Sequence, residues 1–163
     1  MDDHFTGQPH DFDFLVGRWR VANRCLRARH SQCQDWDRFD AMMEAWTHLD
    51  GQVSVDEIAF EGRGRKGMTV RTLDLATRRW AIYWISSTTG HLQPPVHGGW
   101  HGDIGEFVGE DDDDGRRIRA RYVWERLGPE RFRWSQDFAL VDPAGGPDGP
   151  WERNWVMDGE RIR

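Results

Sequence analysis

The chain has 163 residues, of which 28 are acidic and 22 are basic, so its formal net charge is −6 at pH 7, and Lys66 is its only lysine. This balance disfavours nucleic acid as the main partner, because no overall excess of positive charge is present to displace counterions from phosphates, although a local arginine stripe can hold one anion. Ten tryptophans and eight phenylalanines put the apolar area into a few large rings, which argues against disorder and favours one domain spanning residues 1–163.

No apolar run approaches the ~20 residues that a membrane helix needs, and the first ten residues are acidic and polar, without the apolar core of a signal peptide. We therefore expect a soluble cytoplasmic protein with no membrane partner. Cys25 and Cys33 lack the spacing of metal ligands, and two reduced thiols are favoured over a disulfide.

Residues 11–21, DFDFLVGRWRV, are expected to begin a closed barrel. Phe12 and Phe14 flank Asp13 in a run too short for a full helix, which predicts one tight helical turn covering an opening of the barrel. Gly17 lets the chain turn sharply, and Trp19 is the first large residue able to plug the barrel floor. An ordinary turn glycine and an ordinary core tryptophan are the alternative.

Alternation of apolar and polar residues predicts strands along most of the remaining chain. The predicted strands are residues 15–30, 37–49, 52–61, 68–73, 79–86, 106–110, 116–126, 130–141 and 151–161. Asp50-Gly51 supplies a hairpin turn, and strand 79–86 is apolar enough to be covered on both sides. About nine strands with short turns and no amphipathic helix indicate an all-β, up-and-down antiparallel barrel.

Two connections invite a functional interpretation. The glycine-rich run 62–67 is followed by a predicted strand rather than a helix, so a hairpin is favoured over a phosphate-binding loop. Residues 87–105 are the longest irregular stretch and contain His91, His97 and His101, but their spacing matches no zinc signature and we expect no metal.

The acidic run 110–115 resembles the first half of a calcium-binding loop. Aligning it to an EF-hand places Arg121 where the bidentate glutamate must stand, so a charged hairpin tip is favoured.

Three segments together resemble a bacterial family of uncharacterised lipocalin-like, or calycin, β-barrels. They are FDFLVGRW (12–19), LQPPVHGGWHGDIGEF (92–107) and FRWSQDFALVDPAGGPDGPWERNWVMDGER (132–161). The resemblance covers nearly the whole chain and implies a barrel of roughly nine to ten strands around a cavity, a homodimer as the frequent assembly, and no established activity. It also implies that Arg161 packs over Trp19 at the floor. Related nitrobindin-type barrels bind haem through a histidine in a late strand, and no histidine follows His101 here, so no cofactor is expected.

The favoured function is a binder of one small hydrophobic or aromatic molecule in the barrel lumen. Inward rings and polar residues on the same strands are the candidate ligand contacts: Trp19, Asn23, Trp80, Trp84, Arg121, Trp124, Trp134, Gln136, Asn154 and Trp155. Which face of each strand points inward is left open, because a one-residue error in register reverses every assignment. The rings can equally fill the barrel, which would leave an interaction module without a cavity.

The alternative is an enzyme, a cyclase, isomerase or decarboxylase that holds a substrate and moves a proton. Glu152, Tyr122, Tyr83 and His101 are the candidate acids and bases, and a raised carboxylate pKa in an apolar lumen would be the physical sign. Hydrolase, kinase and dehydrogenase signatures are missing, and Lys66 in a glycine-rich turn is the only lysine for Schiff-base chemistry.

Overall fold

The computed structural model describes residues 4–163, and in them ten strands and one short 3₁₀ helix follow each other in sequence. The elements are η1 (Asp13–Leu15), β1 (Gly17–Leu26), β2 (Trp36–His48), β3 (Val53–Phe60), β4 (Arg65–Asp74), β5 (Arg79–Ser86), β6 (Val96–His101), β7 (Ile104–Asp113), β8 (Arg116–Arg126), β9 (Arg131–Leu140) and β10 (Glu152–Ile162). No helix among the described residues is long and apolar enough to cross a membrane.

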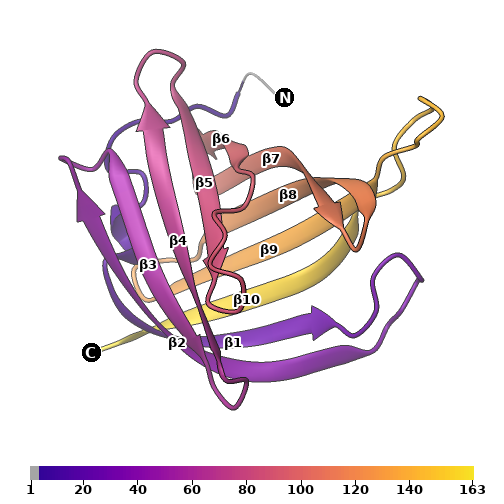
Figure 1. The fold of residues 1–163 in the computed structure, drawn as a ribbon. Helices are drawn as coiled ribbons and strands as arrows, with labels where there is room; N and C mark the ends of the chain where they lie inside the picture. Colours follow the sequence, from indigo (N-terminus) through magenta and orange to yellow (C-terminus); the bar gives the residue numbers. More distant parts are fainter. Residues whose placement is uncertain (1–3) are drawn as a thin grey trace.

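Each strand pairs antiparallel with its neighbour in the sequence, and β10 pairs with β1 to close the barrel (Figure 1). The all-β, up-and-down fold and the short helical turn near the N-terminus are therefore confirmed. Closure leaves no free sheet edge in the ring of strands.

Alternation decides which side chains face inward. In β2, Ala41, Met43 and Ala45 are buried, while Glu44 and Trp46 on the opposite face are exposed. The same period of two runs through the other strands, as expected for a sheet with one face on the core and the other in water. Strand β5 departs from the expectation of complete cover, because Tyr83 and Ile85 on its outer face are only half-buried.

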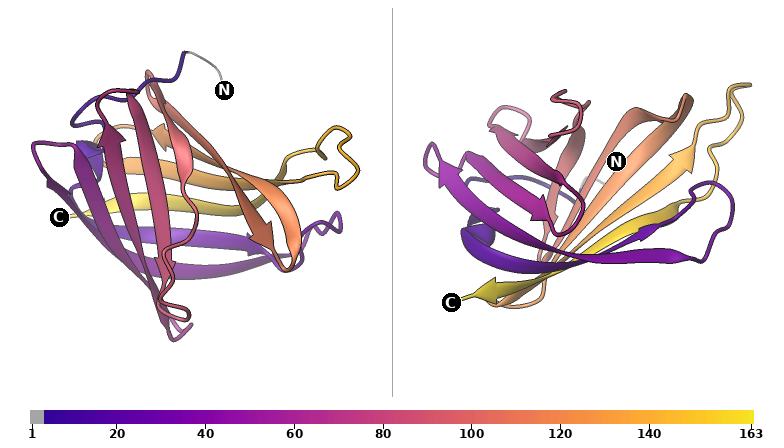
Figure 2. Two further views of the ribbon diagram at one scale, coloured as in Figure 1. Left: turned by 45° about the horizontal axis from the view of Figure 1, so that its top comes forward. Right: turned by 60° about the horizontal axis from the view of Figure 1, so that its bottom comes forward.

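One end of the barrel, called the floor, is closed by the segment before β1 (Figure 2). Phe12, in the turn that leads into η1, lies edge-on to Trp80, with ring centroids 4.9 Å apart, and to Trp100, at 5.4 Å. The Trp80 indole N–H donates to Asp11 at 2.9 Å. Phe12 and Trp80 are each no more than 1% exposed, so the floor is closely packed with aromatic rings.

The first strand turns away from the floor at Gly17, which has φ +120°. Trp19 follows, and its indole N–H donates to Leu15 O at 2.8 Å. The guanidinium of Arg161, near the end of β10, lies 4.3 Å from the centroid of the Trp19 ring and donates to the carbonyl oxygens of Phe14 and Val16. The expected stacking of an arginine on the floor tryptophan is confirmed.

The pairing between β5 and β6 is the shortest in the barrel. It joins only residues 80–82 to residues 96–98. Toward the floor, Thr6 makes an isolated bridge to Trp100, and toward the other end Leu92 makes one to Ile85. Segments outside the strands thus complete the wall where the two strands diverge (Figure 1).

The prediction that residues 87–105 are irregular is wrong for β6 and for the start of β7. Gly98 and Gly99 broke the apolar alternation in the sequence, yet the strand needs them. A Cβ on Gly98 would lie 1.8 Å from Glu106 O, and one on Gly99 would lie 2.4 Å from the carbonyl carbon of Thr6. Close approach of neighbouring backbones is a known reason for glycine inside a strand.

Candidate functional site

The end opposite the floor, called the mouth, carries the connections 27–35, 61–64, 87–95, 114–115 and 141–151. The barrel encloses a cavity of about 430 Å³ that extends from rim residues such as Arg29 and Arg65 to Asp56, Arg71 and Trp124 near the floor. Sites for small molecules commonly have volumes of ~300–1,000 Å³. The cavity therefore has the size of a small-ligand site.

Aromatic rings from opposite walls meet inside the cavity. Strands β5 and β10 are separated by four strands in either direction around the barrel, yet the centroids of Trp84 and Trp155 are 6.2 Å apart, with the rings at 89°. The ring centroid of Trp155 also lies 5.4 Å from that of Trp134 and 5.8 Å from that of Phe60. The centroids of Trp134 and Tyr122 are 5.1 Å apart. These five rings, called the aromatic layer, offer edges and faces to a flat apolar molecule.

Gly67 makes room for one ring of this layer. It faces Trp84 from the neighbouring strand β4, and a Cβ at this position would lie 1.8 Å from the outer edge of the indole. Gly67, which the sequence placed in a flexible turn, belongs to β4. Its missing side chain leaves the space that the Trp84 ring occupies.

Below the aromatic layer the cavity reaches a buried pair of opposite charges. Arg71 on β4 donates through Nη2 to the carboxylate of Asp56 on β3 and through Nη1 to Ser54 Oγ at 3.0 Å. The two charged side chains are 1% and 3% exposed. The guanidinium lies 5.0 Å from the ring of Phe12 and 5.2 Å from that of Trp124. We call Arg71 and Asp56 the inner polar pair.

Burial raises the pKa of the Asp56 carboxyl above its ordinary value, and the nearby charge of Arg71 opposes that effect. Burial likewise raises the pKa of Tyr122, so its phenol is a weaker acid than an ordinary tyrosine. Asp56 is thus a deeply buried carboxyl in the lumen with the raised pKa that the enzyme hypothesis required, although the sequence had not singled it out. Nearer the mouth, burial also raises the pKa of Asp111.

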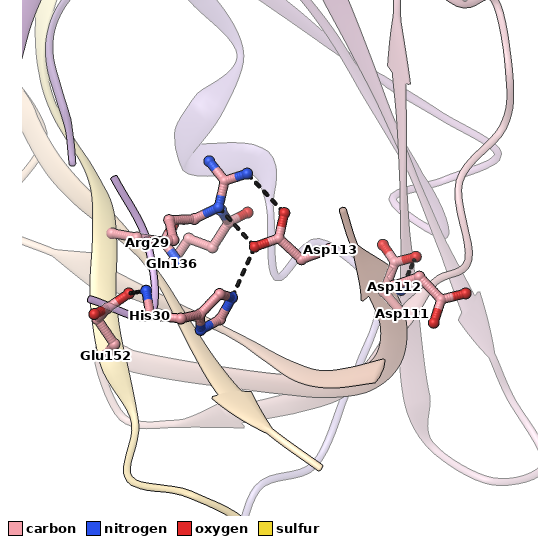
Figure 3. Close-up of polar contacts among 8 residues, drawn as sticks. Arg29, His30, Asp111, Asp112, Asp113, Gln136 and Glu152 are labelled. Atoms are coloured by element: carbon pink, nitrogen blue, oxygen red, sulfur yellow. Dashed lines mark hydrogen bonds and ion pairs between the residues drawn. The ribbon is translucent and has the colours of Figure 1, made fainter. Parts of the chain in front are cut away.

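Charged side chains bridge the mouth (Figure 3). Arg29 donates to both oxygens of Asp113, at 2.8 and 2.6 Å, and His30 Nε2 lies 2.8 Å from the same carboxylate. The backbone N–H of His30 donates to Glu152 at 2.9 Å. Because β10, β9 and β8 lie between β1 and β7 in the barrel, these four residues, called the mouth bridge, connect distant parts of the rim. The hydrogen bond from Arg29 lowers the pKa of Asp113 against the effect of partial burial.

Two amide side chains hold residues of the cavity wall. Asn23 accepts a hydrogen bond from the indole N–H of Trp155 at 3.0 Å, and Asn154 accepts one from the Gln136 amide at 2.8 Å.

Cys25 lines the outer part of the cavity. Burial raises the pKa of its thiol to about 12, with a smaller opposing effect from Arg65.

The structure brings six of the residues predicted from sequence together on the cavity wall. They are Trp84, Tyr122, Trp124, Trp134, Gln136 and Trp155. Asn23 and Asn154 support this wall through the hydrogen bonds described above, whereas Trp19 and Trp80 belong to the floor.

Four other candidates lie away from the cavity wall. Arg121 points outward from β8 and donates to Asp137 at 2.7 Å, and Tyr83 lies on the outer face of β5. Glu152 belongs to the mouth bridge. His101 lies beside Phe5, with ring centroids 6.2 Å apart. In residues 4–163 no three His, Cys, Asp or Glu side chains are placed to hold a metal ion, and His91, His97 and His101 do not converge.

Sequence reasoning missed the inner polar pair, although a signal was present. Asp56 shares a strand face with Ile58 and Phe60, and Arg71 shares one with Leu73. A charged residue in phase with the apolar face of a strand is either buried with a partner or marks a register error, and two such residues on successive strands predict a pair.

Comparison of the chain with protein-family models and with curated proteins finds no match. The geometry of the cavity is therefore the basis for assigning a function.

Proposed function

We propose that this protein is a lipocalin-like, calycin-type barrel that binds one small hydrophobic or aromatic molecule in its lumen. The observation that carries the proposal is the cavity of about 430 Å³ crossed by the aromatic layer. A barrel filled by its own side chains, the interaction module considered from the sequence, would leave no such space.

The wall combines the two properties that favour such a ligand. Large rings supply apolar area and edge-to-face contacts, and a few polar groups, among them Gln136 and Arg71, can orient the molecule. No histidine occurs among the described residues that line the cavity, so a haem would lack the usual axial ligand here.

The test is titration of intrinsic tryptophan fluorescence with a panel of apolar and aromatic compounds, haem included. Saturable quenching by one chemical class is expected, and Trp84→Ala and Trp134→Ala should each weaken that binding. The matched control is Trp46→Ala, because Trp46 is 41% exposed on the outer face of β2. No saturable response from any compound, or equal losses in all three variants, would contradict the proposal.

A second candidate function is proton transfer on a bound substrate, and Asp56 is the observation that favours it. Its carboxyl lines the cavity and has a raised pKa, a property of general acids and bases. Any compound that binds should be tested for turnover. Under this alternative Asp56→Asn keeps binding and loses turnover, whereas unchanged turnover in Asp56→Asn would exclude Asp56 as the acid or base.

The cytoplasmic location and the homodimer stay predictions from the sequence. Sedimentation velocity of the purified protein at several concentrations would test the second of them.

A further inference from the structure

We propose that the inner polar pair recognises an uncharged oxygen acceptor, a carbonyl group, at the buried end of a flat apolar ligand. This inference rests on the proposed function and assigns the chemistry of the ligand's polar end. It is carried by three features: unused donors on Arg71, the charge already balanced by Asp56, and the acidic outer part of the cavity.

Arg71 has more donors than the protein uses. A guanidinium carries five N–H groups, and the side chain makes hydrogen bonds only to Ser54 and Asp56 among the described residues. Nε is buried without a hydrogen-bond partner. Buried polar groups in folded proteins are nearly always satisfied. An arginine that lines a cavity with donors to spare is therefore arranged for an acceptor that arrives from outside the protein.

The charge of Arg71 is already balanced. Asp56 contacts the guanidinium directly, and both side chains are almost completely buried. A ligand carboxylate placed at the same site would stand beside Asp56, and two buried carboxylates near each other repel. A carbonyl oxygen accepts the free N–H groups without adding charge. The pair therefore selects a neutral acceptor, whereas a lone buried arginine would select an anion.

The charges in the outer part of the cavity also favour an uncharged ligand over an anion. Glu110, Asp111, Asp112 and Asp113 line it together with Arg29 and Arg65. Arg29 is held by Asp113. Glu110 is paired with Arg117 outside the cavity lining. Asp111 and Asp112 then stand against Arg65 on the path of an incoming molecule, and an acidic path disfavours the approach of an anion.

The inner polar pair also lies where one end of a bound molecule would stop. Arg71 lies against the floor ring Phe12, 5.0 Å from its centroid, and Trp84 of the aromatic layer stands opposite Thr69, two residues toward the mouth along β4. A flat molecule that inserts among the rings of Trp84, Trp134 and Trp155 would place its far end at Arg71.

The experiment compares three ligands of nearly equal shape by isothermal titration calorimetry at neutral pH: acetylnaphthalene, ethylnaphthalene and naphthoate, substituted at the same ring carbon. The wild-type protein is expected to bind acetylnaphthalene about tenfold tighter than ethylnaphthalene, the size of one hydrogen bond from a charged donor. Naphthoate is expected to bind more weakly than acetylnaphthalene.

Two variants change the order of affinities in different ways. Asp56→Asn leaves the charge of Arg71 unbalanced, so naphthoate should gain about tenfold or more and overtake acetylnaphthalene. Arg71→Met removes the donors, so the advantage of acetylnaphthalene over ethylnaphthalene should disappear. Arg121→Met is the matched control, because Arg121 also pairs with a buried aspartate but lies on the outer face of β8, and it should leave the order unchanged.

Each other outcome decides against the inference. Equal affinity of the wild-type protein for acetylnaphthalene and ethylnaphthalene would overturn it while leaving the ligand-binding function in place. Tightest binding of naphthoate by the wild-type protein would overturn the choice of an uncharged group. Failure of all three to bind, when the fluorescence panel has found another ligand, would overturn the inference alone, and failure in both experiments would overturn both proposals. The wild-type series needs no variant, so a folding defect in Asp56→Asn or Arg71→Met leaves the test decisive.

Discussion

Cys25 shows how the cavity changes the chemistry of one residue. Its thiol has a pKa raised to about 12 by burial, and only the thiolate reacts with alkylating agents. At pH 9, on the order of a thousandth of this side chain is therefore thiolate, since each pKa unit is a factor of ten. Alkylation of Cys25 by iodoacetamide should be at least about a hundredfold slower than that of a thiol in a short peptide, as measured by mass spectrometry of digested samples. A rate within a few-fold of the peptide thiol would show that the side chain is not desolvated.

Asp56 should leave a signature in the pH dependence of stability. Its pKa in the folded protein is raised, mainly by burial, so the folded state holds the proton more tightly than the unfolded state. The resulting stabilisation is complete below the ordinary carboxyl pKa and is lost as pH rises through the raised value. Compared with Asp56→Asn, the wild-type protein should therefore lose free energy of unfolding as the pH is raised from acidic to neutral, as measured by urea unfolding.

Asp74 provides a control of opposite sign. The backbone N–H groups of Thr77 and Ala76 donate to its carboxylate and lower its pKa. Its contribution to stability is present above the ordinary pKa and is lost as pH falls through the lowered value. The free energy of unfolding of the wild-type protein should exceed that of Asp74→Asn at neutral pH, and this difference should shrink as the pH is lowered. Parallel pH profiles for the two comparisons would contradict one of the two assignments, and the common sign would show which.

The mouth bridge ties two connecting segments together at the scale of elements. Asp113 at the end of β7 holds Arg29 and His30 of the connection 27–35, and a buried or half-buried pair that loses one partner leaves the other without compensation. Asp113→Asn should therefore loosen residues 27–35, and amide hydrogen exchange in this segment should be several-fold faster than in the wild-type protein.

Asp112→Asn is the control for the mouth bridge. The Asp112 side chain is next in sequence but takes no part in the contacts to Arg29 and His30. Exchange in residues 27–35 should stay at the wild-type rate in this variant. Equal acceleration by both variants would indicate a general effect of charge at the rim rather than the specific contacts of Asp113.

Most of the strands could be predicted because alternation is a local property of the sequence. Val21 and Asn23 in β1 or Phe132 and Trp134 in β9 repeat with a period of two, whatever lies across the barrel. Strand β6 was missed because its sequence is shaped by close approach of neighbouring backbones rather than by burial of side chains. A glycine that accommodates a neighbour and a glycine that ends a strand look the same in one sequence.

The site was predictable only in part, for a related reason. Alternation predicted which tryptophans share a face of their strand but left open which face lines the lumen. The meeting of Trp84 with Trp155 depends on how β5 and β10 face each other across a closed barrel. No spacing in the sequence encodes that distance. The mouth bridge depends likewise on the path of an irregular connection, for which alternation gives no information.

The whole molecule depends on the joint between its first and last elements. Arg161 lies near the end of β10 but donates to the carbonyl oxygens of Phe14 at 2.7 Å and Val16 at 2.6 Å, which flank the end of η1. It also donates to Pro129 O at 3.0 Å, in the connection between β8 and β9. One side chain thus joins the floor to two further parts of the barrel while it covers the ring of Trp19.

Arg161→Ala should therefore destabilise the barrel by about 2 kcal/mol, since hydrogen bonds from a charged donor and stacking on an indole are lost together, with some replacement by water at this half-buried position. The measurement is urea unfolding followed by tryptophan fluorescence. The matched control is Arg163→Ala, two residues later, where the side chain is 81% exposed and pairs with Glu130 at the surface; exposed pairs of this kind contribute ~0–1 kcal/mol. If the two variants lost equal stability, Arg161 would be an ordinary surface arginine and the barrel would be closed by the strand pairing of β1 with β10 alone.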